Sequence, residues 1–132
     1  MLVGRDHKLI VAIVKKGRAE KVILAAQAAG ARGGTVICGR GTGIHESKKL
    51  LGIMIEPEKE IILILIHKDK VKRVLKAVVE AGNMEKPGTG VGFVLDVEKV
   101  VGIVHLLEQI GEVEDDEDEE GGQDLSPSSR PV

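Results

Sequence analysis

Residues 60–82 read EIILILIHKDKVKRVLKAVVEAG, and this stretch decides the fold of the chain. Its first part, Glu60 to Ile66, is a short run of apolar and partly β-branched residues, which predicts a β-strand. Valine and leucine then recur at the spacing of one helical face, at Val71, Val74, Leu75, Val78 and Val79. Asp69 is placed to cap this helix and Gly82 to close it, so the stretch predicts a strand followed by an amphipathic helix.

The same unit occurs earlier in the chain. Lys8 to Val14 predicts a strand, and a second apolar helical stripe follows it, formed by Ala19, Val22, Ile23, Ala26 and Ala29. Gly30 stands where a glycine commonly ends a helix. Further strands are expected at Thr35 to Cys38 and Gly92 to Val97, with a short fifth at Val100 to Leu107. The predicted order is therefore βαββαβ.

This order predicts an α+β fold, a ferredoxin-like sandwich in which both helices cover one face of an antiparallel sheet. The other face should then carry polar side chains. Instead, Leu9 to Val14 and Ile61 to Ile66 are apolar at odd and even positions, which lie on opposite faces. Each side chain left in water forgoes about 1.5–3 kcal/mol of burial. We therefore expect copies of the chain to pack sheet against sheet.

Composition narrows the classes of function. The 132 residues are 42% apolar, but Phe93 is the sole aromatic side chain, which argues against nucleic-acid binding by base stacking. No apolar run reaches about 18 residues, and Met1 to Lys8 carries charges, so a cytoplasmic protein is expected. Cys38 has no cysteine partner, in agreement with a reducing compartment.

The charge is distributed unevenly along the chain. Residues 1–111 hold 18 lysines and arginines against 12 acids, whereas residues 112–132 hold one arginine against nine acids. Residues 1–111 are predicted to form one domain, and residues 112–132 an acidic, disordered tail, because so charged a segment cannot bury enough apolar surface. One hypothesis is that this tail competes with anionic ligands for basic loops; the other is that it only keeps the protein soluble.

Two basic, glycine-containing tracts lie at the ends of predicted strands. The first is Arg40-Gly41-Thr42-Gly43, and the second is Lys86-Pro87-Gly88-Thr89-Gly90. Glycines let backbone N–H groups approach an anion, threonine can add a donor, and the cation supplies charge. Neither tract has the spacing of a Walker or dinucleotide-binding motif. The tracts predict a phosphate-binding site, although glycines at ordinary turns would read the same way.

Several of these residues together resemble the PII signal-transduction proteins. They are Gly34-Thr35-Val36, the glycine- and arginine-bearing loop, and the stretch from Lys86 to Val100. The likeness covers about Lys8 to Leu107. It implies a homotrimer that binds an adenine nucleotide (AMP, ADP or ATP) in three clefts between subunits. It also implies a T-loop at about 39–58, which controls a transporter or metabolic enzyme, and a B-loop at about 83–92. The implied nucleotide-binding residues are Gly34, Thr35, Val36, Gly39, Arg40, Gly41, Lys86, Pro87, Gly88, Thr89 and Gly90.

The chain also departs from this family pattern. The family has a lysine at the position of Val91 and arginines at those of Gly102 and Val104, all of which meet phosphates. Each missing charge-assisted contact is worth about 1.5–3 kcal/mol, so we expect AMP or ADP to be preferred over ATP. Glu58 stands near a lysine that the family uses with 2-oxoglutarate, which makes that ligand unexpected. The T-loop has no tyrosine, which excludes the family's uridylylation.

Two other classes of function stay open. One is a metal- or small-molecule-binding trimer resembling the divalent-ion-tolerance proteins, which would take ligands from Cys38, His45 or His105. However, the four histidines lack ligand-like spacing, so no metal is expected. The other is an acylphosphatase-like enzyme dependent on Arg40. No catalytic triad or carboxylate pair is visible, so the chain is not expected to be an enzyme. The basic helical face with Lys72 and Lys76 is expected to be solvated rather than to bind nucleic acid.

Overall fold

The computed structural model describes residues 2–43, 48–102 and 114–115. They fall into two units, Lys8–Asp96 and the combination of Met1–His7 with Val97–Val132. The larger unit holds the following elements, of which β2 and β7 each extend one residue beyond its bounds: β2 (His7–Lys15), α1 (Ala19–Ala28), β3 (Thr35–Arg40), β4 (Lys48–Leu50), β5 (Ile53–Ile55), β6 (Glu58–His67), the 3₁₀ helix η1 (Lys68–Lys70), α2 (Val71–Ala81) and β7 (Gly90–Val97). None of the helices in the described part of the chain is long and apolar enough to cross a membrane.

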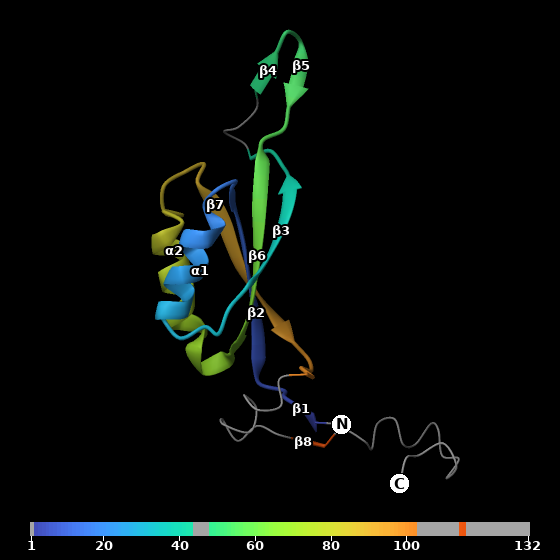
Figure 1. Cartoon of the computed structure of the whole chain (residues 1–132), viewed down its shortest axis with the longest axis vertical. Coiled ribbons are helices and arrows are strands. Elements are labelled where there is room, and N and C mark those ends of the chain that lie inside the picture. The colour runs from blue at the N-terminus through green and yellow to red at the C-terminus, as the bar shows by residue number, and fades with distance from the viewer. Residues whose placement is uncertain (1, 44–47, 103–113, 116–132) are drawn as a thin grey trace, which may run out of the picture. The chain divides into compact units, whose positions relative to one another are not determined.

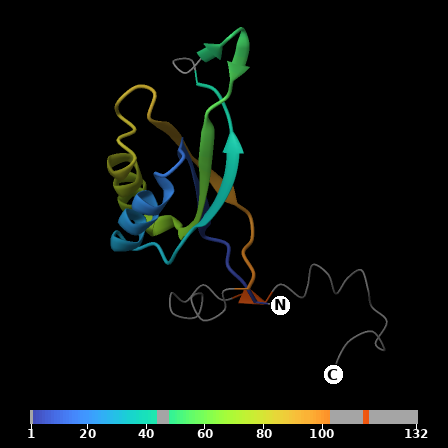
Figure 2. The ribbon, with the colours of Figure 1, turned by 45° about the horizontal axis from the view of Figure 1, so that its top comes forward.

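Four of these strands form one antiparallel sheet in the order β3-β6-β2-β7. β3 pairs with β6 from Thr35 opposite Leu63 to Arg40 opposite Glu58. Figures 1 and 2 show α1 and α2 side by side on the same face of this sheet. The predicted βαββαβ order and ferredoxin-like fold are therefore confirmed.

The core lies between the sheet and the two helices. Alternate residues of the two central strands point into it, and β-branched side chains fill it. The fully buried members from the strands and helices include Ile10, Ala12, Val14, Val22, Ile62, Ile64, Val74 and Val78. The helical stripes read from the sequence supply the matching surface, so the predicted core is confirmed.

The opposite face of the sheet, here called the open face, is also apolar. It carries the intervening residues of each strand, and several are well exposed within the single chain: Ile37 47%, Leu65 39%, Val91 53%, Phe93 42% and Leu95 48%. Large contiguous apolar surfaces are rare on soluble monomers. The prediction that both faces are apolar is confirmed, and nothing within the described part of the larger unit covers the second face as the helices cover the first.

The helix ends differ in one respect from the prediction. Asp69 does not cap α2, because a turn of 3₁₀ helix comes first and places Asp69 inside it. His67 accepts a hydrogen bond at Nδ1 from the Asp69 backbone nitrogen over 3.2 Å and thereby caps η1. α2 itself starts at Val71 without a side-chain cap. At the other ends, Gly82 is the C-cap of α2, and Gly30 follows α1 with a φ of 122°, as predicted.

The connection between β3 and β6 is shorter than the predicted loop at 39–58, and its described part contains two strands. Gly39 and Arg40 belong to β3, where they pair with Lys59 and Glu58, so the connection covers residues 41–57. Backbone pairing does not require apolar side chains, which is why these strand ends were missed. Within the connection, β4 and β5 form a hairpin. Its two-residue turn is Leu51-Gly52, with φ of 52° and 81°, the left-handed pair that such hairpins favour.

The smaller unit contains two short antiparallel strands, β1 (Leu2–Val3) and β8 (Glu114–Asp115). Gly4 and Val100 also exchange two backbone hydrogen bonds of 2.9 and 2.8 Å. Of the predicted acidic tail, the structure describes only Glu114 and Asp115 of β8, so the disorder of the tail remains a prediction. The rest of the tail from residue 116 and most of the predicted strand from Val100 to Leu107 lie outside the described residues.

Candidate functional site

A cavity of about 380 Å³ lies at the end of the sheet where β2 and β3 finish and β6 and β7 begin. The two glycine-containing tracts meet there, although they are far apart in sequence. The described residues that line it are Ile13, Arg40, Gly41, Thr42, Gly43, Lys59, Ile61, Gly88, Gly90 and Val91. The strand order explains the meeting, because it brings the β3–β4 and α2–β7 connections to the same end of the sheet.

The backbone of the second tract is held close to the sheet. Gly88 has a φ of 80°, a conformation that side chains other than glycine rarely adopt. A Cβ on Gly90 would lie 2.7 Å from the carbonyl oxygen of Ile13, so only glycine allows this approach of β7 to β2. Both glycines line the cavity, where no side chain of their own separates their backbone from a ligand.

Thr89 braces this turn. Its hydroxyl Oγ1 lies 2.6 Å from the carbonyl oxygen of Asn83 and 2.8 Å from that of Lys86. A hydroxyl has one proton, so it is directed to a backbone carbonyl of the turn. Thr89 does not line the cavity, and its expected part in phosphate binding remains a prediction.

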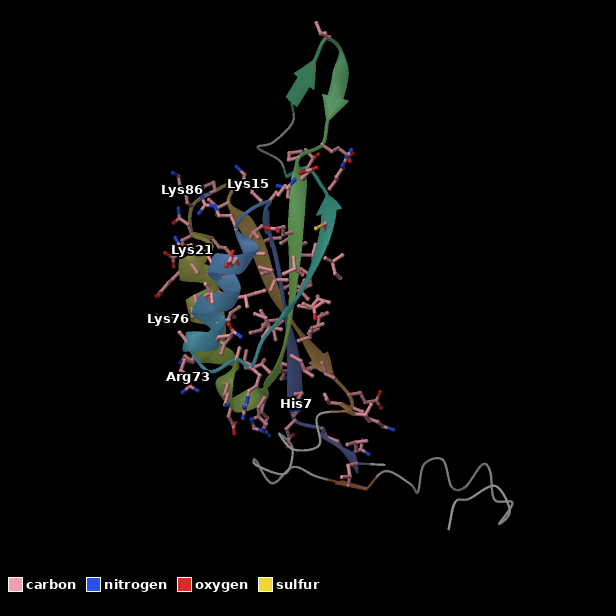
Figure 3. The ribbon with its side chains drawn as sticks, in the orientation of Figure 1. His7, Lys15, Lys21, Arg73, Lys76 and Lys86 are labelled. Carbon is pink, nitrogen blue, oxygen red and sulfur yellow. The ribbon has the colours of Figure 1, made fainter. Side chains whose placement is uncertain are left out.

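Lys86 and Pro87 also lie outside the cavity lining. The Lys86 backbone nitrogen donates to Asn83 over 3.1 Å, which folds the turn back toward the end of α2. Figure 3 shows the Lys86 side chain in the connection on the same side of the sheet as the helices. The expected part of Lys86 and Pro87 in nucleotide binding remains a prediction, and neither residue lines the cavity.

Lys59 is a cavity residue that was not predicted from the sequence. Its neighbours along β6 are both fixed on the helix side of the sheet. Glu58 Oε2 pairs with Lys16 Nζ at 2.8 Å, and Glu60 Oε1 accepts from the backbone nitrogens of Gly17 and Ala19 over 2.7 and 3.1 Å. Because successive side chains of a strand point to opposite faces, Lys59 lies on the open face with Ile61. Only the strand register could have revealed this position.

A smaller cavity of about 260 Å³ lies nearby and shares Arg40 and Lys59 with the first. Its other lining residues are Lys16, Cys38, Gly39, Glu58 and Glu60. The hydrogen bond and charge of Lys16 lower the pKa of Glu58, and those of Glu58 raise the pKa of Lys16. Glu58 is thus the negative half of an ion pair with Lys16. It does not line the larger cavity, whose charged lining residues are Arg40 and Lys59.

The predicted residues at the start of β3 lie away from the cavity. From Thr35 to Arg40 the strand spans roughly 16 Å at about 3.3 Å per residue. Gly34 has a packing role, since a Cβ there would lie 3.3 Å from the Ile64 side chain and from the Leu63 carbonyl oxygen. Gly34, Thr35 and Val36 do not line the described cavity, and their role in binding remains a prediction.

The positions that carry the family departures and the metal alternative are only partly described. Val91 lines the larger cavity as an apolar wall, Gly102 is exposed, and residue 104 lies outside the described residues. Within residues 2–43, 48–102 and 114–115, His, Cys, Asp and Glu form no group of three that could hold a metal ion. Two of the three ligands considered for a metal site, His45 and His105, lie outside these ranges.

Comparison with known proteins gives a family and similar solved structures. The model of the nitrogen regulatory protein P-II family matches residues 7–105. A crystal structure of Arabidopsis thaliana PII bound to citrate is similar, with a TM-score of 0.60 and 27% sequence identity, over 84% of this chain and 91% of the plant chain. No curated protein matches. The match covers both glycine tracts and the sheet between them.

Proposed function

The chain belongs to the nitrogen regulatory protein P-II family, and from this premise we propose that it is a nucleotide-reading regulator. In this proposal, a homotrimer binds an adenine nucleotide, preferably AMP or ADP, in clefts between its subunits. The connection at 41–57, the main part of the expected T-loop, then binds or releases a transporter or metabolic enzyme. Members of this family are regulatory proteins rather than enzymes.

One observation carries the proposal: the larger cavity combines both glycine tracts with two cations and an apolar wall. Arg40 and Lys59 are its only charged residues within the described lining, so it favours an anion. Ile13, Ile61 and Val91 supply an apolar surface on which a flat ring could lie. A cavity of about 380 Å³ falls within the usual range for small-molecule sites.

The position of this cavity supports a cleft between subunits. Ile61 and Val91 belong to the open face, whose apolar side chains are expected to pack against other copies of the chain. A subunit placed on this face would cover the adjoining cavity and could add residues to it. Nucleotide binding and assembly are therefore coupled in the proposal, because the same face serves both.

The proposed preference for fewer phosphates follows from the number of cations. Val91 adds no charge to the cavity where the family resemblance places a lysine, and Gly102 adds none either. A triphosphate brings more negative charge than two side chains and a few amides can balance, whereas AMP or ADP requires less. The citrate bound to the Arabidopsis protein makes a small carboxylate the natural competitor to include in tests.

The connection at 41–57 is the proposed signalling element. It begins at cavity residues Gly41, Thr42 and Gly43, so a ligand there contacts the start of the segment that carries the β4–β5 hairpin. Leu51 in the turn of that hairpin is 94% exposed and could contact a partner. A ligand shifts the connection only as far as it binds one conformer more tightly than another.

The proposal is tested by titrating the full chain with AMP, ADP, ATP, citrate, and ATP with 2-oxoglutarate in a calorimeter. We expect AMP or ADP to bind most tightly and to raise the melting temperature by mass action. The tightest binding by ATP with 2-oxoglutarate would contradict the preference. Binding of citrate with no binding of any adenine nucleotide would contradict the nucleotide role itself.

A further inference from the structure

We propose that Lys59 is the residue that, with Arg40, holds the ligand's phosphate and sets how much negative charge the site accepts. This inference rests on the proposed function, since it assigns the phosphate contact within the same cavity. It is based on the place of Lys59 on the open face of β6, next to the end of β3. Lys59 lines the same cavity as Arg40, Gly88 and Gly90.

The position of Lys59 is fixed from both sides. The contacts of Glu58 with Lys16, and of Glu60 with the first turn of α1, anchor the neighbouring side chains on the helix side of the sheet. A shift of β6 by one residue would break these contacts, because it would move both glutamates to the other face. Lys59 is therefore held on the cavity side by the contacts of Glu58 and Glu60 and by the pairing of β6 with β3.

The charges around Lys59 favour a phosphate over a neutral ligand. The nearby acid Glu58 is engaged by Lys16 at 2.8 Å, and Glu60 by two backbone nitrogens at the start of α1. Their negative charges are thus compensated on the far side of the sheet. Lys59 on the open face and Arg40, which pairs with Glu58 at the strand end, both line the cavity with the backbone of Gly88 and Gly90. This arrangement is suited to one or two phosphate groups.

Lys86 is the obvious rival, because the sequence places it directly in the second glycine tract. However, Lys86 does not line the cavity. Its backbone nitrogen donates to Asn83, and its carbonyl oxygen accepts from the Thr89 hydroxyl. If Lys59 holds the phosphate, its loss should weaken AMP binding more than the loss of Lys86 does. If Lys86 holds it, the order should be reversed.

The experiment compares Lys59→Gln, Lys86→Gln and Lys76→Gln by calorimetry with AMP and adenosine. Lys76 lies on the outer surface of α2 (Figure 3), so K76Q removes the same charge away from the cavity. K59Q should weaken AMP binding about tenfold or more, the value of one charge-assisted contact, while adenosine binding stays unchanged. K59R should restore most of the AMP affinity, and K86Q should lose less than K59Q.

The outcomes separate the two levels of the proposal. If the wild-type chain binds no adenine nucleotide, the proposed function and this assignment both fail. If it binds AMP, and K59Q binds as tightly as wild type or K86Q loses more, only the assignment of Lys59 is overturned. An equal loss of AMP and adenosine binding in a folded K59Q, checked by circular dichroism, would show that Lys59 shapes the cavity rather than contacts phosphate, and would also overturn it.

Discussion

The two faces of the four-stranded sheet are similarly apolar in sequence but differ in what covers them. On the helix face, Ile10, Ile62 and Ile64 have no exposed surface. On the open face, Phe93 and Leu95 are 42% and 48% exposed. The sequence of a strand shows how apolar its two faces are, but not what buries them. The proposed trimer would cover the second face with other copies of the chain, and the candidate site lies where that face ends.

The largest expected effect is loss of assembly on placing a charge in the open face. Phe93→Glu would leave a carboxylate where apolar side chains meet, at a cost of several kcal/mol per subunit from lost burial and desolvation. Because Phe93 is half-exposed within the chain, the monomer should still fold. Analytical ultracentrifugation should show monomers of the variant and trimers of the wild type.

Leu24→Glu is the matched control for this change. Leu24 is 59% exposed on α1, in the helix layer, so it is at least as accessible as Phe93 but lies on the other side of the sheet. L24E should leave the trimer intact. Dissociation by L24E alone would show that the helix layer rather than the open face forms the interface. Dissociation by both variants would show that the loss of assembly is not specific to the open face.

The next effect is a loss of stability when a buried side chain on the helix face of the sheet is truncated. Ile64→Ala would remove buried methyl groups from the core and cost about 2–5 kcal/mol in the free energy of unfolding. Leu65→Ala, the next residue on β6, changes the open face, where 39% of the side chain is exposed. Urea unfolding at a concentration where the chain is monomeric should show a clearly smaller loss for L65A. Equal losses would mean that the faces do not differ in burial.

A smaller effect is expected at the edge where the open face meets the cavity. Gly90→Ala places a methyl group 2.7 Å from the carbonyl oxygen of Ile13, so β7 must move away from β2. The strain should cost about 1–3 kcal/mol and weaken ligand binding in the same cavity. Gly92→Ala is the control, because its nearest contacts, at 3.5 and 3.7 Å, leave room for a methyl group. Thermal unfolding that ranks G92A below G90A would contradict this geometry.

The sequence was sufficient for most of the fold because its signals are local. β-branched runs such as Ile61–Ile66 and the helical stripe of α2 appear in the structure where they were expected. Strand ends were missed at Arg40 and Glu58, because polar residues there pair through their backbone. The capping role assigned to Asp69 was wrong, since the sequence did not show that a 3₁₀ turn would precede α2.

The candidate site was less predictable than the fold, because it depends on register and turn geometry. Arg40, Gly41, Gly88 and Gly90 were chosen for their chemistry, and they do line one cavity. Lys86 looked equally suitable, yet it does not line this cavity. Lys59 gave no local signal, since its placement follows from the pairing of β3 with β6 and from the contacts of the two glutamates beside it.

The smallest expected effect concerns the exposed ion pair on the helix side of the cavity edge. Lys16 lowers the pKa of Glu58 through a hydrogen bond and its charge, so the pair stabilises the fold above the carboxyl's unfolded-state pKa and is lost as the pH falls through the lower, folded-state value. The melting temperature of Glu58→Gln should therefore lie slightly below that of the wild type near neutral pH, and the two should converge as the pH falls from about 5 to about 2.

Salt provides the second arm of this test, because exposed pairs are screened and worth little. The small difference between E58Q and wild type at neutral pH should shrink when the ionic strength rises from about 0.01 M to about 1 M. Glu58 also holds Lys16 on the helix side, opposite the open face, so E58Q should leave the trimer unchanged while F93E abolishes it. A difference that persists at about pH 2 and at high salt would show that Glu58 acts through packing at the end of β6 rather than through its charge.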